Sequence, residues 1–317
     1  MKKSLKIIGI VIGIIVLAIA GLAAWVSFTD LPVYEVRNLP VQVPTDSLSL
    51  ARGEKIVELV CASCHRSEDG LLNGRLFSPE SEGFGELWSG NLTRHPTAGL
   101  GRYQDGEIAW LLRTGIKRDG HLAGPFMMYP HLSDEDLAAV ISYLRSDAPS
   151  LQASGVVRKS RQSFLARALF KIGVFKPLPF EGKPQPTPEP SDQLAYGRYL
   201  ATARYECSSC HSASFETYNV MEPEKSPGFM GGGNPIPDLK FNYVSSRNIT
   251  PDPETGIGKW TREEFKVAIQ NGIRPDKSPL TFNMPRFSML TDEEIDAIWA
   301  YLQTVPALNT SQAVAGK

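Results

Sequence analysis

Two copies of one five-residue motif constrain this 317-residue chain more than any other feature. The motif is Cys-x-x-Cys-His, and its two copies, Cys61 to His65 and Cys207 to His211, use all four cysteines. In this motif two thiols are spaced to bond the two vinyl groups of one porphyrin, and the adjacent imidazole can bind the iron. The sequence therefore predicts two covalently bound haem c groups, attached through these residues: Cys61, Cys64 and His65 for the first, and Cys207, Cys210 and His211 for the second.

Two other kinds of site use paired cysteines. Four thiolates from the two pairs could hold a structural zinc ion, or each pair could be a redox dithiol of the thioredoxin type. A zinc site needs no histidine directly after both pairs, and a redox dithiol is expected in a βαβ setting that this sequence does not indicate. The motif therefore favours haem attachment over both alternatives.

The N-terminus predicts a membrane anchor. Three lysines, Lys2, Lys3 and Lys6, precede an uncharged and largely apolar run of 22 residues, Ile7 to Phe28. About 20 residues suffice for a helix to cross a membrane, and the lysines favour a cytoplasmic N-terminus. A cleaved signal peptide is the alternative, with a small-residue site at Ala18-Ile19-Ala20. Because the apolar run continues past that site, we expect residues 1–28 to stay as a single-pass anchor in the inner membrane, with the rest on the periplasmic side.

The rest of the chain contains an internal repeat. The segment from Asn91 to Gly101 aligns without a gap with Asn248 to Gly258, at an offset of 157 residues, while the haem motifs are offset by 146. Further matches follow in the same order, so each copy contains one haem motif and one complete set of elements. The repeat predicts two tandem domains, 47–148 and 191–306, joined by a linker, 149–190.

The elements of each copy read as helices. A short helix runs into each cysteine pair, and Ser133 and Thr291 are N-caps with an acidic residue three positions on. Four further helices are expected at Asp105 to Arg113, Asp134 to Arg145, Arg262 to Gln270 and Asp292 to Gln303. No segment shows sustained period-two alternation. We therefore predict an all-α chain with two tandem class I cytochrome c domains and an N-terminal transmembrane helix.

The charges are unevenly distributed. Each predicted domain carries a net charge of −4, whereas the linker carries +5. This pattern gives no basic groove for a nucleic acid, so none is expected as a partner. The linker mixes cations with apolar residues between 156 and 180 and then becomes Pro-rich. Its first part could lie on an anionic membrane surface or pack against the two haem domains, and its second part is expected to be a stiff spacer.

The sixth ligand of each iron determines the chemistry, because a haem with an open site can bind peroxide or oxygen. In the second copy, Met284 precedes a proline and the last helix, which is the usual position of a thioether ligand. In the first copy either Met127 or Met128 could reach the iron, and the alignment of residues 126–128 with 282–284 slightly favours Met128. Three histidines are further candidates but align with other residue types, so exposed loop positions are expected for them: His95, His121 and His131.

These motifs together resemble the cytochrome c subunits of membrane-bound bacterial alcohol, gluconate and related dehydrogenases. The residues that carry the resemblance are the two haem motifs, the segment from Asn248 to Trp260, the Asn271-Gly272-Ile273-Arg274 turn and Met284-Pro285. Those subunits commonly have three haem motifs, and this chain has two. The resemblance implies a membrane-attached carrier of single electrons from a dehydrogenase or quinol donor to a terminal acceptor. A di-haem peroxidase is the alternative, because the irregular methionine region of the first copy could leave one iron open.

Overall fold

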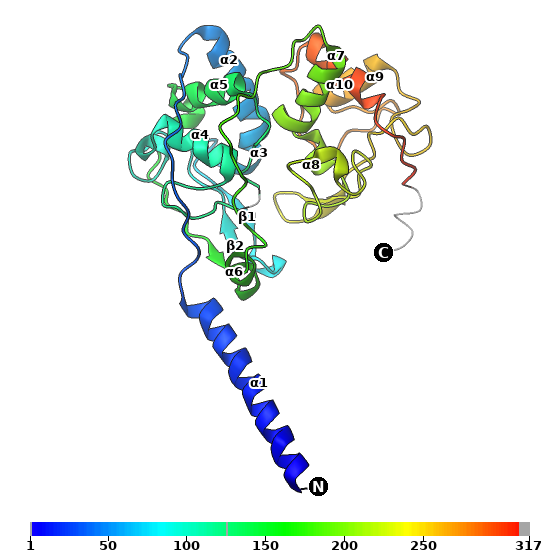
Figure 1. Cartoon of the computed structure of the whole chain (residues 1–317). Coiled ribbons are helices and arrows are strands. Elements are labelled where there is room, and N and C mark those ends of the chain that lie inside the picture. The colour runs from blue at the N-terminus through cyan, green and yellow to red at the C-terminus, as the bar shows by residue number, and fades with distance from the viewer. Residues whose placement is uncertain (1, 125, 311–317) are drawn as a thin grey trace.

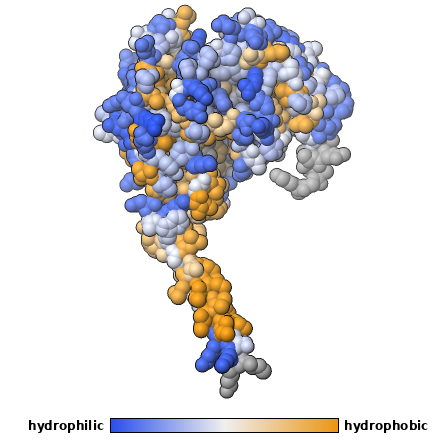
Figure 2. All heavy atoms as spheres, viewed as in Figure 1, coloured by the Kyte–Doolittle hydropathy of each residue, from blue (hydrophilic) through white to orange (hydrophobic). Residues whose placement is uncertain are grey.

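The computed structural model describes residues 2–124 and 126–310 (Figure 1). Helix α1 (Lys2–Phe28) extends away from the body of the molecule as a single rod and is apolar along most of its length (Figures 1 and 2). Its 27 residues correspond to about 40 Å of helix. Within the span Lys3–Phe28, a window of 18 residues has a mean hydropathy of 3.0 and no buried residue, so the span's length and composition allow it to cross a membrane. A signal sequence near an N-terminus has the same properties.

The first copy is framed by two helices that cross. Helix α2 (Ser47–Ile56) begins at Asp46, whose carboxylate accepts hydrogen bonds from two backbone amides of the first turn. It continues as a π-helix (Val57–Cys61) and then as α3 (Ala62–His65). Helix α4 (Asp105–Thr114) and α5 (Asp134–Arg145) follow. Helix α2 packs against α5 at Gly53, where an added Cβ would lie 1.9 Å from the carbonyl oxygen of Ala139. Only glycine permits this close approach.

The second copy repeats the arrangement. Helix α7 (Gln193–Tyr199), a π-helix (Leu200–Arg204) and α8 (Cys207–Cys210) lead to the second motif, and α9 (Arg262–Asn271) and α10 (Asp292–Leu302) complete the frame. Helix α7 meets α10 at Gly197, where a Cβ would again lie 1.9 Å from a carbonyl oxygen, that of Ala297. The four helices predicted with both limits are thus confirmed to within one residue at each end, and the same crossing recurs in both copies.

Each copy has its own hydrophobic core. One cluster of buried side chains runs from Ile56 to Leu151 and the other from Tyr196 to Val305. Two residues of the first π-helix connect them. Leu59 is buried in the core of the second copy, and Val60 packs against both clusters. The two cores therefore meet at the helical segment that leads into the first cysteine pair.

Short strands accompany the helices. β1 (Leu76–Ser78), β2 (Gly85–Trp88) and β3 (Arg161–Gln162) form one antiparallel sheet, and β4 (Pro235–Pro237) and β5 (Tyr243–Ser245) form another. Strands of two to four residues are too short to produce a visible alternation of polar and apolar residues. The all-α prediction is therefore correct for the helices that frame each copy and incomplete for these loops.

The connecting segments lie against the first copy. Residues 29–46 follow its surface in an extended form, and the amides of Tyr34 and Leu39 donate hydrogen bonds to the carbonyls of Gly120 and Gly106. After β3, the linker forms α6 (Phe164–Lys171) beside the end of α1 (Figure 1). Its Pro-rich part reaches the start of α5, where the Thr187 hydroxyl donates to the Ser133 hydroxyl at 2.7 Å. The spacer is therefore fixed to the first copy at its far end.

Candidate functional site

The two motifs lie at corresponding places in the two copies. Cys61 ends the first π-helix and Cys64 and His65 lie in α3, while α8 contains Cys207 and Cys210 and is followed by His211. All four thiols are free of disulfide bonds and partly buried. Within each motif one helical turn separates the two thiols, which places them on the same side of the helix.

Both motif histidines are fixed by the backbone. The Nδ1 atom of His65 lies 2.7 Å from the carbonyl oxygen of Gly90, and Nδ1 of His211 lies 2.6 Å from that of Arg247. A carbonyl can only accept, so each Nδ1 carries the proton and each Nε2 has a free lone pair. Burial lowers the pKa of both imidazoles, which favours this neutral form. A neutral imidazole oriented through its second nitrogen is the form that binds a metal.

The carbonyl groups that hold the histidines belong to one repeated turn. Gly90 precedes Asn91, whose side-chain oxygen accepts from the amide and the hydroxyl of Thr93 at 2.9 and 2.7 Å. Asn248 accepts from Thr250 at the same two distances. The Asn-x-Thr signature of the sequence repeat therefore has a structural role, because it shapes the loop that positions each histidine.

These residues fit a haem c group. Two thiols and one imidazole with a free Nε2 are the donors that such a group requires. Near His65, the Nε atom of Arg75 is buried and has no hydrogen-bond partner among the described residues, and the Arg75 charge contributes to the lowered pKa of His65. A buried cationic donor of this kind suits an acidic substituent such as a haem propionate.

The described donors are not gathered as a zinc site requires. Burial raises the pKa of Cys61 and of Cys207 to about 12, and that of Cys210 to about 11, so that these thiols are protonated when no ligand is bound. In residues 2–124 and 126–310, no three His, Cys, Asp or Glu side chains converge on one point. The arrangement of the donors thus supports the haem hypothesis against zinc.

The methionine turns of the two copies can be aligned through their hydrogen bonds. The amide of Ala123 donates to Gly115 O and that of Leu280 to Gly272 O, at an offset of 157 residues. At the same offset, the amide of Met127 donates to Gly124 O and that of Met284 to Thr281 O. The structure therefore aligns Met127, and not Met128, with Met284.

Between the methionine and the next backbone hydrogen bond, the first copy has one residue fewer than the second. The amide of Tyr129 donates to Leu112 O and that of Phe287 to Ile269 O, which shifts the offset to 158. Met128 falls in this shortened stretch and is buried, and it would contact a Cβ placed on Gly115. Met127, in contrast, is partly buried beside the cluster that Cys61 also contacts. The alignment of residues 126–128 with 282–284 that favours Met128 has an offset of 156, so it requires one extra residue before the methionine and two fewer after it.

The three other histidines make contacts elsewhere. The Nδ1 atom of His95 accepts from the amide of Ala98 at 3.1 Å, and His121 lies 3.4 Å from the Asp119 carboxylate. His131 Nε2 lies 2.9 Å from the carbonyl oxygen of Met221 in the second copy. None of these contacts involves a cysteine motif.

The two motifs lie close to each other. The Cys64 thiol is near enough to Cys210 to contribute to the raised pKa of that thiol. Tyr129 lies among thiols of both motifs, and its own pKa is raised by burial and by their charge. An aromatic contact also crosses between the copies, because the Phe126 and Phe215 rings meet edge to face with centroids 5.6 Å apart. The arrangement places both candidate haem sites at the junction between the copies.

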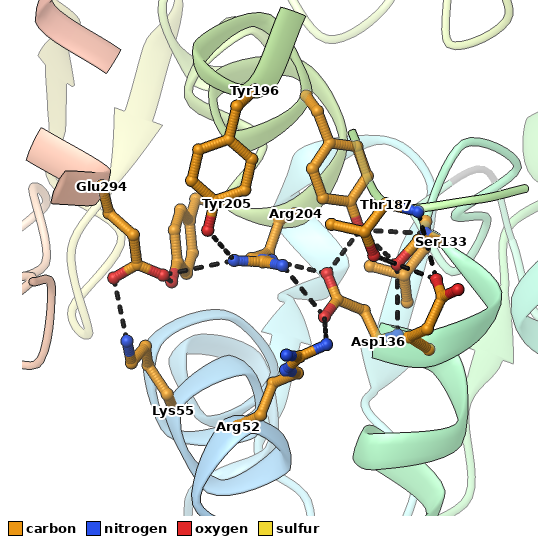
Figure 3. A network of polar contacts seen from close by, with 12 residues as sticks. Arg52, Lys55, Ser133, Asp136, Thr187, Tyr196, Arg204, Tyr205 and Glu294 are labelled. Carbon is orange, nitrogen blue, oxygen red and sulfur yellow. Dashed lines mark hydrogen bonds and ion pairs between the residues drawn. The ribbon is translucent and has the colours of Figure 1, made fainter. Parts of the chain in front are cut away.

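A buried ionic network holds this junction together (Figure 3). Arg204, at the end of the second π-helix, lies between Asp136 of α5 and Glu294 of α10. Its Nη2 donates to Asp136 at 3.1 Å and its Nη1 to Glu294 at 3.2 Å. Each of these three side chains is at most 6% exposed. Lys55 of α2 adds an ion pair of 2.8 Å with Glu294, so that both copies contribute charges.

Sequence reasoning found part of this network only as helix caps. Asp136 and Glu294 occupy corresponding positions, and both had been recognised as capping-box residues. Glu294 does close its box, because it accepts from the amide of Thr291 at 2.9 Å. The Asp136 carboxylate instead accepts hydrogen bonds from Arg204 and from the Tyr199 hydroxyl. The amide of Ser133 donates to that same hydroxyl at 2.9 Å. No sequence signal identified Arg204 as the cation that both carboxylates share.

Comparisons with known proteins agree with this geometry. The cytochrome c family model matches residues 50–147 and 194–306. An alcohol dehydrogenase (quinone) cytochrome c subunit of Gluconacetobacter polyoxogenes is 28% identical over 288 residues, which cover 84% of this chain and 58% of that protein. The fructose dehydrogenase cytochrome subunit of Gluconobacter japonicus is 27% identical, with 82% and 53% covered. A diheme cytochrome c-type protein of Cereibacter sphaeroides is 26% identical, with 81% and 86% covered. The chain thus spans a little over half the length of the two dehydrogenase subunits.

Proposed function

Because the chain belongs to the cytochrome c family, we propose that it is an electron-transfer protein with two covalently bound haem c groups, one in each copy. The observation that carries this proposal is the recurrence of one complete site. Both copies contain the paired thiols and a buried histidine whose Nδ1 lies 2.6 to 2.7 Å from a loop carbonyl. When bound, each haem supplies an iron that accepts and releases a single electron.

His65 and His211 are the proposed fifth ligands. The hydrogen bond from each Nδ1 to a carbonyl fixes the imidazole ring and directs Nε2 away from the loop. The same bond makes the ligating nitrogen more electron-rich. The chain thereby sets both the position and the donor strength of the histidine before any partner binds.

Met284 and Met127 are the proposed sixth ligands. They occupy equivalent turns, and each packs beside the hydrophobic cluster that contacts a motif cysteine, Cys207 or Cys61. A thioether as second axial ligand raises the reduction potential and closes the iron to small molecules. A methionine in both copies therefore supports a carrier, and no feature of the described residues favours the peroxidase alternative.

Variants at the two candidate methionines of the first copy test the ligand assignment. Met127→Leu is expected to remove one of two thioether-to-iron absorption bands in the red and to lower one potential, because leucine offers no donor. Met128→Leu is the matched control, since it changes the neighbouring residue and keeps the apolar volume. Loss of the band in Met128→Leu, with the band retained in Met127→Leu, would reverse the assignment.

Helix α1 is the proposed membrane anchor, with the body on the periplasmic side of the inner membrane. The names of the relatives support a dehydrogenase as electron donor, and the acceptor is then a further redox protein of the respiratory chain. The domain limits 47–148 and 191–306 are part of the proposal, and the two hydrophobic clusters fall within or beside them.

The function is tested on the full-length purified protein. Pyridine haemochrome measurement after denaturation should give two haems per chain, and a redox titration should give two one-electron steps. The protein should consume hydrogen peroxide negligibly in the presence of a reduced donor. One haem or none per chain would contradict the cofactor proposal, and steady peroxide turnover would contradict the carrier proposal.

A further inference from the structure

Helix α6 is attached to the end of α1 by charged groups. Arg167 Nε donates to the carbonyl of Val26 at 2.9 Å, and the Lys171 ammonium donates to the carbonyl of Trp25 at 2.7 Å. The same ammonium lies 5.0 Å from the centroid of the Trp25 ring. The last carbonyls of a helix lack partners within the helix and carry a partial negative charge. These two cations satisfy them and fix α6 at the point where α1 leaves the body.

Part of the apolar side of α6 is exposed. Four apolar side chains on α6 and the turn after it are half or more exposed: Phe164 at 53%, Leu165 at 51%, Ile172 at 62% and Val174 at 58%. Within α6 itself only Ala166 is buried. In the space-filling view, apolar surface continues from α1 onto the adjoining base of the body (Figure 2). The other apolar side chains of this segment are at least partly buried, and the Phe175 ring contacts Phe84 of the first copy with centroids 6.2 Å apart.

Exposed cations flank this apolar face. Lys159 and Arg161 precede α6 and Lys176 follows it, and all three are exposed. Arg161 pairs with Glu86 at 3.1 Å, yet 72% of its side chain remains accessible. Apolar side chains combined with nearby cations are the composition of a surface that binds an anionic bilayer, where cations meet headgroups and apolar groups enter the acyl boundary.

We propose that α6 and the turn up to Val174 form a second membrane contact, in which the four exposed apolar side chains enter the outer leaflet of the bilayer that α1 crosses. The proposal rests on α1 being a retained anchor. We choose a lipid surface as the occupant because α6 is hydrogen-bonded to the last turn of the proposed spanning helix, so that the two helices are continuous at the membrane surface. Two contacts at this junction would hold the first copy at a fixed orientation above the membrane, where a single helix would allow it to rotate and tilt.

The test measures lipid contact at single positions. The full-length protein is reconstituted in vesicles of phosphatidylcholine and phosphatidylglycerol, with the photoreactive residue p-benzoylphenylalanine at one site at a time. Leu165 and Ile172 report on the proposed contact. Phe28, which is 88% exposed at the end of α1, reports on the anchor, and Leu48, which is 81% exposed on α2, is the distant control. Lipid adducts are expected at Phe28, Leu165 and Ile172, and none at Leu48.

The outcomes separate this proposal from the anchor itself. Adducts at Phe28 without adducts at Leu165 and Ile172 would overturn the second contact and would show that another surface covers α6. No adduct at any position would overturn the anchor as well. A second variant checks the apolar origin of the contact. Ile172→Glu combined with Val174→Glu should lower the adduct yield at Leu165 severalfold and leave Phe28 unchanged, whereas Leu48→Glu should change neither. An unaltered yield at Leu165 in the double variant would contradict the proposal.

Discussion

Replacing Arg204 by methionine is the most direct test of how the two copies are joined. The change keeps an unbranched side chain and removes the cation between Asp136 and Glu294. Asp136 then retains the Tyr199 hydroxyl and a long contact of 3.8 Å with Arg52. Glu294 retains Lys55 at 2.8 Å. The greater loss therefore falls on Asp136, which is fully buried.

The magnitude follows from the burial of these groups. Removing one partner of a buried ion pair costs about 3–5 kcal/mol, because a charge is left in a poorly solvated place. For a folded unit of this size, each kcal/mol lowers Tm by about 2–4 °C, so Arg204→Met should lower Tm by about 6–20 °C. Thermal unfolding of the full-length protein in detergent, followed by circular dichroism, measures this shift.

Two controls distinguish the network from a general loss of charge. Lys259 pairs with Glu254 at 2.8 Å, but both side chains are about two-thirds exposed. Lys259→Met should therefore lower Tm by only about 4 °C or less, because exposed ion pairs contribute about 0–1 kcal/mol. The double variant Asp136→Asn, Arg204→Met removes the carboxylate that has lost its partner and keeps the pair of Glu294 with Lys55, so it should be more stable than Arg204→Met alone.

The reasoning fails under either of two results. If Arg204→Met melts within about 2 °C of the unmodified protein, the junction does not depend on this cation. If the double variant Asp136→Asn, Arg204→Met melts at a lower temperature than Arg204→Met, the penalty does not arise from the unpaired Asp136 carboxylate. Redox titration of the same variants should also show a changed interaction between the two haems, since the network is proposed to fix their relative position.

Further predictions concern the helix crossing and the response to acid. Gly197→Ala should destabilise the second copy by about 1–3 kcal/mol or more in denaturant unfolding, because the methyl group would lie 1.9 Å from Ala297 O; an unchanged midpoint would refute the close crossing. Burial alone would raise the pKa of Glu294, but Lys55 and the Thr291 amide hold it below its usual 4.5. The folded state therefore binds this proton less readily than the unfolded state, so stability should fall as the pH drops below about 4.5. Glu294→Gln should weaken that fall below about pH 4.5, measured as Tm against pH, and an identical profile would contradict the assignment.

The sequence predicted the helical frame well because its signals are local. N-caps such as Ser133 and Thr291, helical spacing of apolar residues and the aligned repeat segments locate each helix without knowledge of tertiary contacts. The cysteine motifs are equally local, since their spacing alone identifies the chemistry. These parts of the structure can be predicted from a single sequence.

The parts that the sequence could not predict depend on contacts between distant segments. Arg204 meets Asp136 across 68 positions, and nothing near either residue indicates the pairing. The alignment of Met127 with Met284 required the hydrogen bonds of its turn, because the sequence alone also allows Met128 to be aligned with Met284. The extended path of residues 29–46 was also missed, since it is held by backbone bonds that carry no side-chain signature.

The same turn and the same histidine contact occur in both copies. Each copy can therefore serve as the reference with which the other is compared. Three differences in length separate the two sites. The first copy has one residue fewer after Met127, and the second copy has eleven more residues between its motif and its Asn turn. The second copy also has the additional Tyr205-Glu206 step before Cys207, where Glu206 adopts a left-handed backbone with φ of 49°. Exchanging these short segments between the copies would transfer the effect of each segment on its haem centre to the other centre of the same polypeptide. Any spectroscopic contrast between the centres can then be traced to a particular segment without a second protein for calibration.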